Sequence, residues 1–172
     1  MPSLAVTVVG TDRPGIVNRV TAAIADRSGN LEDSSMSLLR GHFAMTLIAD
    51  FPDAGAAALL DSDLADLRDQ SLTVSVIPVP AQEPSRQGVA ATVAVHGADR
   101  PGIVRAATAT ILGFQGNIVD LSTRLGSDLY VLTAEVVFPV GTDVSVVDQA
   151  LRSQMADLGV TASVHASEAD LL

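Results

Sequence analysis

Cysteine is absent from the 172-residue sequence, which excludes disulfide bonds, thiolate metal sites and cysteine catalysis. Long apolar runs are absent too, because no segment approaches the roughly 18 to 20 residues that a membrane-spanning helix needs. The amino terminus lacks the charged-then-apolar pattern of a signal peptide. We therefore expect a cytoplasmic protein that makes no membrane contact. With 48% hydrophobic residues, the chain can bury a sizeable core in one ordinary domain or two small ones.

Lysine is also missing, and the ten basic residues are all arginine. They are outnumbered by 20 acidic residues, which gives a formal net charge of -10. Such a surface repels phosphate backbones and anionic lipids, and neither half shows a helix-turn-helix signal. We therefore expect no direct binding to nucleic acid.

An internal repeat organises the chain. The stretch GTDRPGIV at residues 10–17 returns 87 positions later as GADRPGIV at residues 97–104. The same offset holds without insertion as far as a shared Phe-Pro pair, and a period of this length fits a duplicated small domain. The segment between the copies is rich in proline and polar residues, as linkers are. The sequence predicts a first domain at 1–79, a linker at 80–88 and a second domain at 89–168.

Hydrophobic periodicity predicts the same order of elements in each copy, βαββαβ. An apolar, β-branched strand leads into the DRPG loop, and an amphipathic helix follows. A hairpin, a second helix and a short final strand complete the copy. The predicted hairpins cover 30–52, hinged near Gly41, and 117–139, hinged near Gly126-Ser127, and the predicted second helices cover 54–70 and 143–158.

The residues that should begin and end the first helix of each copy recur in pairs. An aspartate is suited to the N-cap, a proline to the first turn, and a glycine to the left-handed stop after the last turn. These residues are Asp12, Pro14 and Gly29 in the first copy and Asp99, Pro101 and Gly116 in the second.

This order of elements, with these motifs, resembles the ACT domain, a small ferredoxin-like module that senses amino acids. The whole chain is similar to the tandem-ACT family of the glycine cleavage system transcriptional repressor. The resemblance rests on DRPGIV followed by G-N-[LI]-x-D in both halves, on DSSMSLLRGHFAM in the first, and on NIVDLSTRLG in the second. It implies an α+β fold of two antiparallel sheets, each with helices on one face. It also implies a small amino acid as ligand, glycine being the first candidate, a homodimer, and a DNA-binding transcription regulator as partner.

The repeated loop suggests where such a ligand binds. A loop that enters a helix presents unpaired backbone N–H groups and the positive end of the helix dipole, which suit a carboxylate. The glycine of DRPG lets a ligand approach the backbone closely. Aspartate and asparagine oxygens that match the family pattern are candidates for the ammonium group. The predicted ligand-binding residues are Asp12, Pro14, Gly15, Ile16 and Asn30, with Asp99, Pro101, Gly102, Ile103 and Asn117.

Structural interpretations stand beside these functional ones. The aspartates can serve only as caps, the glycines only to relieve crowding, and the asparagines only to form a turn. We expect Arg13 and Arg100 to face solvent, and Met36 and Met45 to fill the core or an interface.

The chain has no nucleophile–base pair, metal-ligand spacing or phosphate-binding loop, so we expect no catalysis, no metal and no cofactor. A protein-interaction module without a ligand remains the alternative to an amino-acid sensor.

Overall fold

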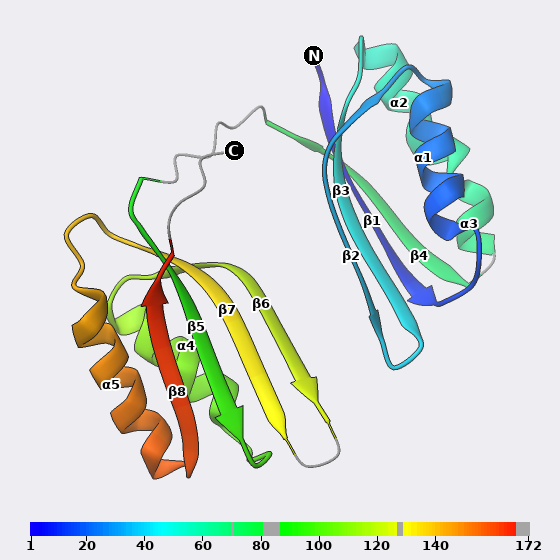
Figure 1. Cartoon of the computed structure of the whole chain (residues 1–172). Helices are drawn as coiled ribbons and strands as arrows, with labels where there is room; N and C mark the ends of the chain where they lie inside the picture. The colour runs from blue at the N-terminus through cyan, green and yellow to red at the C-terminus, as the bar shows by residue number, and fades with distance from the viewer. Residues whose placement is uncertain (70, 81–86, 127–128, 168–172) are drawn as a thin grey trace. The chain divides into compact units, whose positions relative to one another are not determined.

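The computed structural model describes residues 1–69, 71–80, 87–126 and 129–167. The chain divides into two compact units, Met1–Glu83 and Pro84–Leu172, and each unit is described by itself. In Figure 1, the blue-to-green ribbon is the first unit and the green-to-red ribbon is the second. Within the described ranges, no helix is long and apolar enough to cross a membrane.

The first unit is a four-stranded sheet with helices on one face (Figure 1). The strand order is β2-β3-β1-β4, and all neighbouring strands are antiparallel. Its elements are β1 (Ser3–Thr11), α1 (Ile16–Asp26), β2 (Asn30–Leu39), β3 (His42–Asp50), α2 (Ala54–Asp63), α3 (Ala65–Asp69) and β4 (Leu72–Val79).

The second unit repeats this arrangement with strand order β6-β7-β5-β8. Its elements are β5 (Val89–Gly97), α4 (Ile103–Gly113), β6 (Asn117–Leu125), β7 (Tyr130–Phe138), α5 (Val144–Asp157) and β8 (Val160–Ala166). Both units also carry a bulge at the third residue of the edge strand, at Glu32 and at Val119. The predicted α+β fold of two ferredoxin-like units is confirmed.

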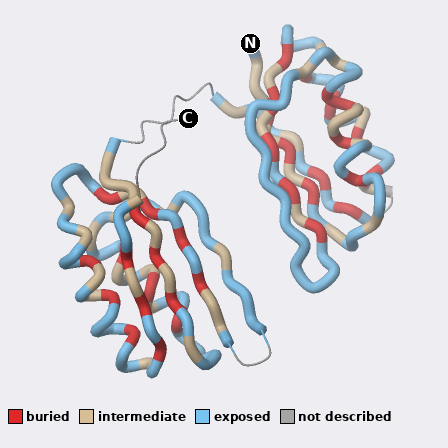
Figure 2. Tube along the Cα trace, viewed as in Figure 1, coloured by how far each residue is buried: buried red, intermediate tan, exposed pale blue. Residues whose placement is uncertain are grey.

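The core of each unit lies between the sheet and its helices. Along β1 the side chains of Leu4, Val6 and Val8 are buried, while the residues between them point to the uncovered face. The red segments of Figure 2 show this alternation along the central strands. The helical residues predicted to face the core are buried in both units: Ile16, Val20, Ala23 and Ile24 on α1, and Ile103, Ala107 and Ile111 on α4.

The end of α1 corrects one prediction. The left-handed residue is Ser28, with φ 55°, and Gly29 follows it. The amides of both residues donate to carbonyls of the last turn, from Ser28 to Ala25 over 2.8 Å and from Gly29 to Ile24 over 2.9 Å, which is a Schellman motif. Glycine is required because a Cβ at position 29 would lie 2.7 Å from Cε1 of Phe51.

The second unit ends α4 in the same way, with Gln115 as the left-handed residue at φ 57°. Gly116 is therefore not the left-handed stop that the sequence predicted. Its role is to let the chain pass close to the ring of Phe138.

The predicted hinge of the first hairpin is confirmed, because Arg40 and Gly41 both have positive φ between β2 and β3. The predicted helix over 54–70 is two helices separated at Leu64. Several predicted features fall partly outside the described residues: residue 70 of that helix, 81–86 of the linker, Ser127 of the second hinge and residue 168 of the second domain.

Candidate ligand site at the DRPG loops

Two equivalent loops connect the first strand of each unit to its first helix. In the first unit the loop spans 12–15, between β1 and α1, and in the second it spans 99–102, between β5 and α4. The amide of Asp12 donates to the carbonyl of Gly41 over 3.1 Å. This hydrogen bond places the first loop beside the hairpin that joins β2 to β3.

Glycine, not aspartate, is the N-cap residue of both helices. Gly15 and Gly102 have φ values of 96° and 99°, and no side chain caps either helix. Their carbonyls accept the first helical hydrogen bonds, from Arg19 and Ala106, both over 2.9 Å. The predicted capping role of the aspartates is therefore wrong, and Asp12 lies outside the helix altogether.

The prolines also lie outside the first helical turn. Pro14 and Pro101 precede the N-cap glycine, and the helices begin at Ile16 and Ile103. The reason is the left-handed glycine, which turns the chain after the proline and delays the start of the helix. The sequence placed these prolines in the first turn, which is wrong.

The capping glycines are needed for their backbone conformation and not for space. A Cβ on Gly15 or Gly102 would meet no other atom within 4 Å, so the interpretation that they relieve crowding is wrong. An L-residue with a side chain would be strained at these φ values. The result is an open approach to helix N-termini whose first amides have no side-chain acceptor, where an anion is favoured.

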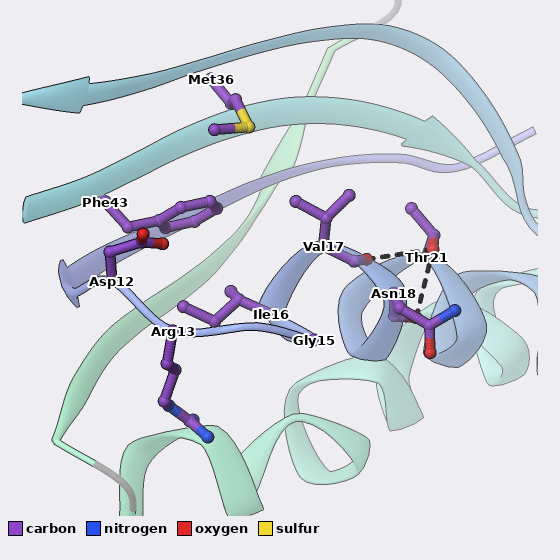
Figure 3. A pocket seen from close by; sticks show the side chains of 9 residues that line it. All are labelled: Asp12, Arg13, Gly15, Ile16, Val17, Asn18, Thr21, Met36 and Phe43. Carbon is purple, nitrogen blue, oxygen red and sulfur yellow. Dashed lines mark hydrogen bonds between the residues drawn. The ribbon is translucent and has the colours of Figure 1, made fainter.

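A surface depression of about 530 Å³ lies at the first loop, and we call it the loop depression. Figure 3 shows Met36 and Phe43 on one side of it and Val17 on the other. Thr21 on α1 also faces it and donates to the carbonyl of Val17 over 3.0 Å. Its lining residues are Asp12, Arg13, Gly15, Ile16, Val17, Asn18, Thr21, Met36 and Phe43.

Several of these lining residues were not predicted from the sequence. Met36 was expected to fill the core or an interface, yet it is 52% exposed, whereas Met45 is buried in the core. Phe43 and Met36 reach the loop from the β2–β3 hairpin, which is distant along the chain. The sequence held only a weak signal for these two residues. They are positions at which the two repeats differ, Met36 matching Thr123 and Phe43 matching Tyr130.

The two loop arginines differ from each other. The Nε and Nη2 atoms of Arg13 are buried without a hydrogen-bond partner, so its predicted exposure to solvent is wrong. Its side chain points toward the helices that follow β3, away from Met36 and Phe43 (Figure 3). Arg100 is exposed, as predicted. It lies over the C-terminal end of α5 near Gly159, where a cation is favoured by the helix dipole.

The two asparagines lie at the opposite end of their sheets from the loops. Asn30 begins β2 and pairs with Asp50, while the loop follows the far end of β1. A strand of nine residues spans about 30 Å, so one ligand cannot contact both places in one unit. Asn30 donates to the Glu32 carboxylate over 2.5 Å. Asn117 lines a separate depression of about 250 Å³.

No group of three or more histidine, aspartate or glutamate side chains forms a metal-ligand cluster in the described part of the chain. The loop depression offers backbone amides, one carboxylate, one side-chain amide and a hydroxyl beside apolar side chains. These groups suit the binding of a small zwitterion.

Two βαββαβ units with glycine-capped loops define a tandem ACT-domain protein. The ACT-domain family pattern matches residues 3–76. A UPF0237 protein of Methanosarcina mazei is 34% identical over 71 residues, which are 41% of this chain and 77% of that protein. The chain belongs to the ACT-domain family.

Two further similarities cover nearly the whole chain. The glycine cleavage system transcriptional repressor of Escherichia coli is 26% identical over 94% of this chain and 88% of its own length. The crystal structure of a putative glycine cleavage system transcriptional repressor superimposes with a TM-score of 0.74 at 20% identity, over 97% of this chain and 98% of that one. The chain is thus an ACT-domain protein that is similar over nearly its whole length to the glycine cleavage system transcriptional repressor.

Proposed function

We propose that this protein is a non-catalytic regulator that binds a small amino acid at its DRPG loops and acts through a protein partner. The observation that carries the proposal is the geometry of the two loops: each leads into a helix N-terminus that no side chain caps. The amino-acid carboxylate accepts hydrogen bonds from these amides, and Asp12 or Asp99 receives the ammonium group. Glycine is the first candidate because of the similarity to the glycine cleavage repressor.

The partner in this proposal is a DNA-binding transcription regulator. A protein with 20 acidic and 10 basic residues binds phosphate backbones poorly, so an effect on transcription passes through another protein. We further propose that residues 1–79 and 89–168 are the two ACT domains and 80–88 their linker.

The asparagines support a homodimer in this scheme. Because Asn30 lies about 30 Å from its own loop, a ligand at that loop does not contact this asparagine within one unit, and a second copy of the chain is one source of an asparagine for it. Association across β2 also satisfies the backbone groups of an exposed edge strand.

A second candidate function is a pure interaction module whose loops bind no ligand. The exposed apolar side chains of β2 favour it, since Met36, Leu38 and Leu39 are each at least half exposed. Exposed apolar side chains on both faces of an edge strand suit association with another protein.

Thermal denaturation with a panel of amino acids separates the two functions. A ligand that binds only the native state adds roughly 2.7 kcal/mol at about 100 times its Kd. For a chain of this length the melting temperature then rises by roughly 5 to 10 °C. If no amino acid moves the melting temperature, the sensor is refuted and the interaction module is favoured.

A further inference from the structure

We infer that the loop depression of the first unit selects an amino acid with a large apolar side chain over glycine. The inference rests on the proposed function, in which an amino acid binds at the DRPG loop. It names the class of ligand that this particular depression accepts.

The polar groups of the depression lie along the loop. Asp12 and the amides that follow Gly15 belong to the loop and the start of α1. These groups match the ammonium and carboxylate that every amino acid shares. They position the ligand without distinguishing one side chain from another.

Two lining side chains present exposed apolar surface to the depression. Phe43, which also lines it, is only 2% exposed. Met36 and Val17 lie on two sides of the depression (Figure 3) and are 52% and 39% exposed. Glycine has no side chain to cover them, so they would stay in contact with water. A leucine or methionine side chain would remove this apolar surface from water, which is favourable in proportion to the area covered. Met36 can adapt to either shape because its side chain is flexible.

The second unit offers less of this apolar surface. At the equivalent positions Thr123 replaces Met36, Tyr130 replaces Phe43 and Arg105 replaces Asn18, whereas Val104 is retained. A hydroxyl, a phenol and a guanidinium favour a more polar ligand. The preference for an apolar amino acid therefore belongs to the first unit, and the natural differences between the repeats supply the substitutions that test it.

The test is calorimetry of the full chain with glycine, L-leucine and L-methionine. We expect leucine and methionine to bind at least tenfold more tightly than glycine. The double variant Met36→Thr/Phe43→Tyr installs the residues of the second unit and should reduce this preference at least fivefold. The control is Leu39→Thr, an exposed residue of the same strand, because Leu39 pairs with His42 on the uncovered face, opposite the face of Met36.

The outcomes separate the selectivity for apolar amino acids from amino-acid binding itself. If glycine binds as tightly as leucine, or if the double variant keeps the wild-type preference, the selectivity inference is overturned while amino-acid sensing stands. An equal effect of Leu39→Thr would also overturn it, because the strand and not the depression would then control binding. If no amino acid binds, the proposed function fails as well. Circular dichroism of each variant checks that it is folded.

Discussion

Alanine substitutions at two glycines of the second unit should have opposite effects, although the residues are only three positions apart. At Gly116 a Cβ would lie 2.6 Å from Cε1 of Phe138 and 2.8 Å from Cγ2 of Ile111. Neither neighbour can move freely, because Phe138 is 0% and Ile111 1% exposed. Overpacking of this kind costs about 1 to 3 kcal/mol, so Gly116→Ala should lower the free energy of unfolding by that amount.

Gly113 is the matched control within the same segment. It is the last residue of α4, its φ is not positive, and a Cβ there would meet no other atom within 4 Å. Alanine in a helix is favoured over glycine by about 0.5 to 1 kcal/mol, partly because it restricts the unfolded chain. Gly113→Ala should therefore stabilise the second unit.

Urea denaturation measures both changes, provided that the transition of the second unit is followed separately. Hydrogen exchange of the amides of α4 and β7 gives this separation, since both elements belong to the second unit. Gly29→Ala repeats the test in the first unit, where a Cβ would lie 2.7 Å from Cε1 of Phe51. The packing argument is refuted if Gly116→Ala is as stable as the wild type, or if Gly113→Ala destabilises the unit equally.

Three further predictions concern substitutions in the second unit. Arg152 and the backbone amide of Val164 both donate hydrogen bonds to the carboxylate of Asp148, and these bonds lower its pKa. The stability that this lowered pKa provides is present above the unfolded value near 4 and is lost as the pH falls through the folded value. Asp148→Asn should therefore flatten the decline of stability between about pH 5 and pH 3; an unchanged acid profile in urea titrations would contradict this. Leu151→Ala should cost about 2 to 5 kcal/mol, because this side chain is 0% exposed, and a loss below about 1 kcal/mol would be inconsistent with its burial. Gly102→Val should abolish the thermal shift from an amino acid at the second loop, whereas Gly141→Val, with a similar φ and equally open surroundings, should cost similar stability and leave the shift intact.

The order of elements and the core faces could be predicted from the sequence because local periodicity determines them. Alternation along β1 and the spacing of Ile16, Val20 and Ile24 on α1 need no knowledge of distant contacts. The duplication was equally visible, since the DRPG loop is nearly identical in both copies.

The starts and ends of the helices were predicted less well, because each depends on which single residue adopts a positive φ. Sequence alone favoured Asp12 as a cap and Gly29 as a left-handed stop, both reasonable from residue preferences. In the structure Gly15 and Ser28 take the positive φ values. Preferences of this kind are weak, and packing of the helix end against the sheet overrides them.

The composition of the candidate site depended on the tertiary structure. The sequence identified the loop from its motif, but the pairing of β1 with β3 brings Phe43 beside it, and the pairing of β2 with β3 brings Met36. The same pairings place Asn30 at the far end of the sheet. The sequence by itself therefore determined the repeat, the strands and helices, and the loop. The antiparallel sheet decided which side chains surround that loop, because its register joins residues that lie far apart along the chain.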